Sequence, residues 1–282
     1  MRLGLHLTQD GVSYEQIRTT AIEAEKAGLE SFWLLDHLHA SPRADSQFLE
    51  CWTVLSALAA ETKRIRLGAL VLNINNRNPA LVAKMATTLD QISDGRLEFG
   101  IGAGGLQRAK QGKELGFEYD VVAYDIPFPM KPSIRIEKLD EGLEIIKRMW
   151  TGEKTTFVGK HYSVKDAICL PRPVQKPHIP IWVGGGSGAK MMRVVARQAD
   201  GWNMMGVKTV DDYKLGLKAL SKACSRVGRG LDEIKTSLAI SGSVEECNEK
   251  LRRFGEEGLD SAILRVPIGQ EIKYLKDLDV ID

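Results

Sequence analysis

The chain has 282 residues, 43% of them hydrophobic and 27% charged, which is enough for one large α/β domain with a buried core. A net charge of +2, without a long run of one sign, disfavours nucleic acid as a partner. Four cysteines without a CxxC pair disfavour a zinc site or disulfide framework, and no apolar run is long enough to span a membrane. We therefore predict a cytoplasmic protein without a membrane partner.

Eight apolar segments alternate with segments of helical periodicity along the chain. Ser13 with Gln16, and Ser243 with Glu246, predict capped starts for two of the helical segments. Strands are predicted at residues 2–7, 31–35, 65–72, 97–101, 179–183, 202–205, 236–241 and 262–266. Eight such units at this length predict a TIM (β/α)8 barrel that forms a single domain over 1–282. A doubly wound open sheet shows the same alternation, but eight units favour the closed barrel.

Residues 65–105 contain the most informative strand–helix–strand unit. Asn78 and Pro79 are typical of the cap and first turn of a helix. Its buried face is predicted from apolar residues at helical spacing, namely Leu81, Met85, Leu89 and Ile92. Both strands lead to the C-terminal edge of a parallel sheet, where ligands bind in such folds. We expect the active site at this edge.

Two segments interrupt the alternation. Residues 106–133 contain three prolines and no period, so we predict an insertion or lid over the barrel mouth after strand four. Residues 155–158 and 161–164 predict a small hairpin around a Gly-Lys turn. A short terminal helix is predicted after residue 266.

The glycine run Gly100 to Gly105 matches GxGxxG after a strand. A dinucleotide-binding fingerprint would require an apolar helix directly afterwards, whereas the polar, unperiodic LQRAKQGKELG follows. We reject that interpretation. A tight turn, or glycines that let a flat ligand lie against the backbone, both remain open.

A second glycine run, Gly185, Gly186, Ser187 and Gly188, lies between a strand and a helix. Backbone N–H groups and the helix dipole at such a position favour a bound phosphate. The alternative is a glycine-rich connection without a ligand.

Histidines follow the first two strands: His6 the first, and His37 and His39 the second, beside Asp36. A third firm metal ligand is not visible, so a metal site is disfavoured. A proton-transfer role is favoured, since an ordinary histidine pKa near 6.5 suits exchange near neutral pH.

Several ordered segments carry a resemblance to a known family. They are SFWLLDHLHA (31–40), WTVLSALAAETKRIRLG (52–68), NPALVAKMATTLDQISDGRLEFGIGAG (78–104), RIEKLDEGLEIIKRMWTG (135–152), PIWVGGGSGAKMMRVVARQADGWN (180–203) and GSVEECNEKLRRFGEEGLD (242–260). Together the chain resembles the bacterial-luciferase-like flavin/deazaflavin superfamily, especially its coenzyme F420-dependent branch. The resemblance implies a TIM barrel, often dimeric, with FMN or F420 at the C-terminal edge.

The resemblance also implies roles for individual residues. A non-prolyl cis peptide at Leu70-Val71 would support the isoalloxazine ring, and Asn73 would hydrogen-bond the ring edge. The backbone of Ala103 and Gly104 would approach the ring, and Gly185, Gly186, Ser187 and Gly188 would hold the phosphate. Asp36 and His37 match an Asp-His pair whose histidine is the acid/base.

The chain departs from relatives at three places. Gly105 stands where sugar-phosphate dehydrogenases of the family have a catalytic glutamate, which lowers the case for that substrate. His6 stands where methylenetetrahydromethanopterin reductases have an acid, so we count it with His37 among the catalytic candidates. The connection at 241–243 is also short.

These observations predict an oxidoreductase that transfers a hydride between a small organic substrate and F420, without a metal, in a homodimer. One alternative is an FMN-dependent monooxygenase that uses oxygen. The other is a flavin- or F420-binding protein without turnover.

Overall fold

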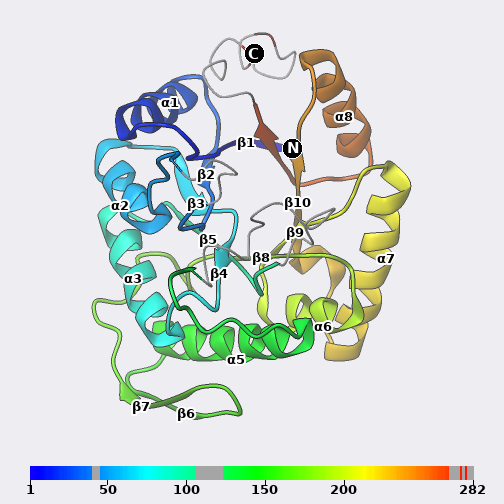
Figure 1. Ribbon diagram of the computed structural model, residues 1–282. Coiled ribbons are helices and arrows are strands. Elements are labelled where there is room, and N and C mark those ends of the chain that lie inside the picture. Colours follow the sequence, from blue (N-terminus) through cyan, green and yellow to red (C-terminus); the bar gives the residue numbers. More distant parts are fainter. Residues whose placement is uncertain (40–44, 106–122, 267–273, 275–276, 278–282) are drawn as a thin grey trace.

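A closed barrel of eight parallel strands forms the centre of the molecule in the computed structural model, which describes residues 1–39, 45–105, 123–266, 274 and 277 (Figure 1). Its strands are β1 (Arg2–Leu7), β2 (Ser31–Leu34), β3 (Arg66–Ala69), β5 (Leu97–Gly102), β8 (Ile181–Gly185), β9 (Gly201–Met204), β10 (Lys235–Ile240) and β11 (Ser261–Arg265). Pairing of β1 with β11 and of β3 with β5 closes the ring. The predicted TIM barrel is confirmed.

Helices surround this ring (Figure 1). They are α1 (Tyr14–Lys26), α2 (Cys51–Glu61), α3 (Pro79–Ile92), α5 (Pro132–Thr151), α6 (Ala189–Gln198), α7 (Val210–Val227) and α8 (Val244–Glu256), with a short 3₁₀ turn η1 at Leu231–Glu233. The predicted hairpin is present as β6 (Thr155–Val158) and β7 (Ser163–Ala167), which project from the body of the molecule at the lower left. None of the described helices is both long and apolar enough to cross a membrane.

Local side-chain chemistry fixes where several helices begin. Ser13 caps α1 in a capping box with Gln16, and Asn78 caps α3 with Pro79 as its first residue. A second such box begins α8 at Ser243. In each case a side-chain oxygen accepts a hydrogen bond from an otherwise unpaired amide of the first turn. These predicted helix starts are confirmed.

The third predicted strand, 65–72, is wrong as a continuous element. β3 ends at Ala69, the Leu70–Val71 peptide bond is cis, and Leu72–Asn73 form a separate strand β4 that pairs with β5 outside the ring. The run appears continuous in sequence because apolarity reports burial and not backbone conformation. The cis bond lies where the family resemblance implies it.

The predicted buried face of α3 is also wrong in part. Leu81 and Ile92 are exposed, whereas α3 buries Val82, Ala83 and Ala86. The small residues allow close packing on α5, where the Trp150 indole donates to the Ala83 carbonyl at 3.0 Å. The large apolar residues of α3 therefore did not identify its buried face.

Two further predictions meet the limits of the described chain. Residues 106–122 of the predicted lid lie outside the described residues, and α5 already begins at Pro132, within that segment. The predicted C-terminal helix after 266 also lies mostly outside them.

The barrel interior holds its own small apolar cluster, separate from the layer between strands and helices. It consists of Trp33, Leu70, Trp182 and Ile263, with Val71 packed against them. The two tryptophan rings meet edge to face at 6.5 Å between centroids. All five tryptophans of the chain are buried, as expected for core residues.

Candidate functional site

Asp36, which follows β2 at the C-terminal edge of the barrel, ties two loops together. Its buried carboxylate accepts two hydrogen bonds from Arg77, both at 2.9 Å, and one from the Asn73 backbone amide at 2.9 Å. These partners leave Asp36 directed at the protein and not into the barrel mouth. Any contribution to a cofactor therefore passes through the position of the 70–73 segment.

Arg77 is a functional candidate that sequence reasoning missed. Besides Asp36, its guanidinium donates to Glu50 Oε1 at 2.6 Å. Burial alone would lower the pKa of Arg77, but the two carboxylates outweigh burial and raise it above its ordinary value. Its only sequence signal is one cation in the polar loop 73–77.

His37 directly follows Asp36 and is half-buried. Because Asp36 is fixed by Arg77 and Asn73, the backbone that carries His37 is held at the end of β2. The structure thus places the predicted acid/base at the expected edge of the barrel.

Asn73, Ala103 and Gly104 are brought together as predicted. Asn73 Oδ1 accepts from the backbone amide and the side-chain amide of Asn75, at 3.0 and 2.9 Å, and Asn75 also donates to the Ala103 carbonyl at 3.0 Å. Gly104 has φ +73°, and a Cβ there would lie 2.7 Å from Asn73 Oδ1. With its oxygen occupied, Asn73 has its NH₂ group available to a ligand.

The glycines of the fourth strand make room for the protein itself. A Cβ on Gly100 would lie 2.0 Å from the Ala69 carbonyl oxygen, and one on Gly102 would lie 2.8 Å from Val71 Cγ2. A Cβ on Gly184 of β8 would likewise lie 2.9 Å from Val71 Cγ1. Gly102 and Gly184 thus leave space for the Val71 side chain, and Gly100 for the Ala69 carbonyl, while contact of this glycine run with a flat ligand stays a prediction.

The predicted phosphate loop is open toward solvent. Gly186, Ser187 and Gly188 are exposed, and a Cβ on Gly188 would meet no atom within 4 Å. Gly188 is the N-cap of α6 and supplies no capping side chain, so no side chain caps the first helical amides. Gly185 differs, since the Met191 side chain fills its space at 2.9 Å.

His6 lies on β1 inside the barrel and is 3% exposed. Burial, with a smaller contribution from the charge of Arg265, lowers its pKa to about 3. Burial therefore favours the neutral imidazole, and the predicted catalytic role of His6 stays a prediction. Its Nε2 is buried without a hydrogen-bond partner.

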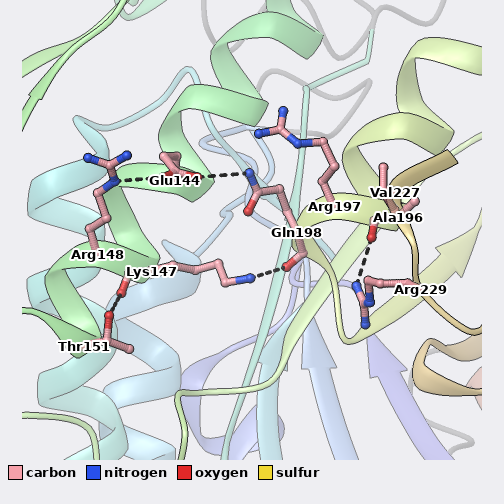
Figure 2. A pocket seen from close by; sticks show the side chains of 9 residues that line it. All are labelled: Glu144, Lys147, Arg148, Thr151, Ala196, Arg197, Gln198, Val227 and Arg229. Atoms are coloured by element: carbon pink, nitrogen blue, oxygen red, sulfur yellow. Dashed lines mark hydrogen bonds and ion pairs between the residues drawn. The ribbon is translucent and has the colours of Figure 1, made fainter. Parts of the chain in front are cut away.

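Among the described residues no group of His, Cys, Asp or Glu is arranged to hold a metal ion. A cavity of about 480 Å³ lies elsewhere, between the C-terminal ends of α5, α6 and α7 (Figure 2). There Arg148 pairs with Glu144 at 2.7 Å, and Lys147 and Arg229 donate to carbonyls at the end of α6. Cations at these positions satisfy helix C-terminal carbonyls, a structural role.

Comparisons with known proteins identify the family and support the fold. Among sequence relatives, the F420-dependent glucose-6-phosphate dehydrogenase of Microbacterium testaceum is 31% identical over 246 residues, 86% of this chain and 68% of that protein. Among solved structures, an F420-dependent secondary alcohol dehydrogenase in complex with an F420-acetone adduct superposes with TM-score 0.84 at 17% identity, covering 99% of this chain and 98% of that one.

A second solved structure, the coenzyme F420-dependent tetrahydromethanopterin reductase from Methanopyrus kandleri, has TM-score 0.78 at 19% identity over 98% of this chain and 96% of that one. Both likenesses support the barrel fold. The profile of the luciferase-like monooxygenase family matches residues 1–261. The chain therefore belongs to the luciferase-like monooxygenase family.

Proposed function

We propose that this protein is an oxidoreductase that transfers a hydride between a small organic substrate and coenzyme F420. The observation that carries the proposal is the cradle at the barrel mouth, in which Val71 lies against Gly102 and Gly184 beside the uncapped start of α6. Sequence relatives whose names specify F420 support this cofactor over FMN.

The residues present suit a deazaflavin with a phosphate-bearing side chain. Val71, half-buried in the mouth, offers an apolar surface to a ring, and the Asn73 NH₂ group a donor to its edge. Gly186, Ser187 and Gly188 offer exposed backbone to a phosphate at the positive end of the α6 dipole. When bound, F420 supplies a carbon, C5, that accepts or releases a hydride.

The protein's part in the chemistry is proton transfer and positioning. In alcohol oxidation, His37 takes the hydroxyl proton while the carbon that bears the hydroxyl group releases its hydrogen as a hydride. In carbonyl reduction, His37 returns a proton to the carbonyl oxygen. Asp36 and Arg77 fix the backbone that carries His37 and Asn73.

Titration of the cofactor-free protein tests the cofactor. F420 is expected to bind tightly and FMN weakly, followed by fluorescence or absorbance. The reverse order would support the FMN-dependent monooxygenase that uses oxygen, and binding of neither would refute the cofactor site.

Substitution of His37 tests turnover. His37→Ala is expected to retain F420 binding and lose turnover, whereas His39→Ala, two residues further on, serves as the matched control. Unchanged turnover in His37→Ala would remove the acid/base role, and absence of turnover in the wild type would favour a binding protein.

Assembly and location belong to the same proposal. We propose a cytoplasmic homodimer, as the family resemblance implies. All four cysteines are buried and none forms a disulfide, which is consistent with a reducing compartment. Light scattering of the purified protein would give the mass in solution, and a monomeric mass would contradict the dimer.

A further inference from the structure

We propose that the substrate carries an anionic group, a carboxylate or a phosphate, and that Arg265 and His6 bind it on the side of the barrel mouth formed by β1, β10 and β11. This inference rests on the proposed function, since it names the substrate class of that site. It is carried by two groups that the proposed cofactor site does not use.

Strand register places both side chains on the inner face of the barrel. His6 on β1 pairs with Arg265 on β11 and with Trp33 on β2. Paired residues of neighbouring parallel strands have side chains on the same face, and Trp33 belongs to the interior cluster. Ile263, two residues before Arg265, belongs to that cluster too. Arg265 is therefore the next inward residue of β11 and lies at the open end.

Arg265 is exposed, and in the described part of the chain no hydrogen bond or ion pair engages its guanidinium. Partial burial of the guanidinium lowers the pKa of Arg265, yet an arginine in a protein stays charged. A partly desolvated guanidinium without a carboxylate is the donor that carboxylate and phosphate ligands engage with two parallel hydrogen bonds.

His6 is a second polar residue on the same inner face, next to Arg265 in the strand register. Its Nε2 is buried and has no hydrogen-bond partner. A buried polar atom of this kind lacks a hydrogen bond that a ligand could provide. A neutral imidazole beside a cation can donate to an anionic oxygen without acquiring a charge of its own.

The interior has room for a ligand at this place. Ala239 on β10 pairs with Ile263 and so shares its inward face, yet it is exposed. An exposed alanine next to the last residue of a barrel strand shows that the mouth is open beside β10 and β11. The proposed cofactor contacts lie on β4, β5 and the loop after β8, so a substrate beside Arg265 would lie across the mouth from them.

Anion binding to the cofactor-free protein tests the site without turnover. Malonate and inorganic phosphate are titrated calorimetrically at constant ionic strength into the wild type, Arg265→Gln and Arg226→Gln, a matched control with an exposed cation on α7. We expect roughly tenfold or greater loss of anion affinity in Arg265→Gln only. Equal affinity in all three proteins, or no binding of either anion, would overturn the proposal.

A substrate panel then separates substrate from cofactor. With F420 bound, wild-type turnover of small 2-hydroxy acids and phosphate-bearing alcohols is expected to exceed that of neutral secondary alcohols, and Arg265→Gln to reduce this preference at least roughly tenfold. F420 affinity should not change in Arg265→Gln. A tenfold loss of F420 affinity with an unchanged substrate preference would assign Arg265 to the cofactor and overturn the proposal. Failure of F420 to bind at all would refute the proposed function, while the anion titration would still stand.

Discussion

Inward-facing polar side chains of the strands have partners at the base of the barrel, whereas at the mouth two of them, His6 and Arg265, have none among the described residues. At the base, where the strands begin, Glu98 forms an ion pair with Arg66 and accepts from the Trp182 indole at 2.5 Å. At the mouth, where the strands end, His6 Nε2 and the Arg265 guanidinium have no partner among the described residues. All these side chains lie on the inward face of the strands, so the two ends differ in whether a partner is present.

Polar side chains near the base are also paired with residues outside the ring of strands. Arg66 also donates to Gln175 at 2.7 Å, and Arg96 donates to the carbonyls of Ala59, Thr62 and Ile65 near the end of α2. The cations of the cavity in Figure 2 are engaged in the same manner. Complete pairing stabilises the fold, whereas unpaired groups at the mouth cost stability that a ligand can restore.

The largest expected effect is at the base. Glu98→Ala leaves Arg66 and the Trp182 N–H without their acceptor, and we expect a loss of about 3–5 kcal/mol in the free energy of unfolding. Glu256→Ala removes a surface i,i+4 partner of Arg252 and should cost about 0.5 kcal/mol or less. Urea unfolding followed by circular dichroism measures both. Similar midpoints for the two variants would contradict the contrast between base and surface.

Asp36→Ala is expected to have the next largest effect, because it affects both stability and the site. Removal of this carboxylate leaves Arg77 with Glu50 alone and frees the Asn73 amide. We expect a loss of about 3 kcal/mol, together with weaker F420 binding as the 70–73 segment shifts. Thermal unfolding and F420 titration provide the two readouts. Weaker stability with unchanged F420 affinity would separate Asp36 from the cofactor site.

Local sequence signals predicted the frame of this molecule well. Caps such as Ser13 with Gln16 depend only on residues three apart, and alternating strands and helices gave the barrel before any contact was known. The glycines were harder to interpret. Gly102 and Gly184 are 82 positions apart, and only the folded chain shows that both contact Val71.

The unpaired groups could not be predicted because pairing is a property of the assembled ring. Arg66 and Arg265 are both arginines at the ends of apolar strands, yet one meets Glu98 and the other meets no carboxylate among the described residues. A cation inside an apolar strand signals an unusual position, but the sequence does not reveal its partner. The same holds for His6, whose burial removes its ordinary titration.

The pH dependence of the free energy of unfolding measures how much the burial of His6 at the mouth destabilises the fold in acid. Its pKa is about 3 in the folded protein and ordinarily 6.5, so between these values the unfolded chain binds a proton that the folded state does not. Stability is therefore lost as pH falls below about 6.5, by about 2 kcal/mol between pH 7 and pH 5. The non-titrating His6→Gln should lose about that much less over this interval. Parallel stability curves for both proteins would show that His6 titrates normally.

The smallest effect on stability compares Gly184, in strand β8, with Gly188, in the loop that follows it. In Gly184→Ala, the new Cβ would meet the stiff Val71 side chain at 2.9 Å, whereas in Gly188→Ala it would meet nothing within 4 Å. We expect Gly184→Ala to cost about 1–2 kcal/mol, and Gly188→Ala less than about 0.5 kcal/mol. Because displaced Val71 would enter the cofactor position, Gly184→Ala should also weaken F420 binding roughly tenfold. Thermal unfolding and F420 titration of both variants test this pair. Wild-type F420 affinity in Gly184→Ala would mean that Val71 does not contact the cofactor, even though it lies in the mouth.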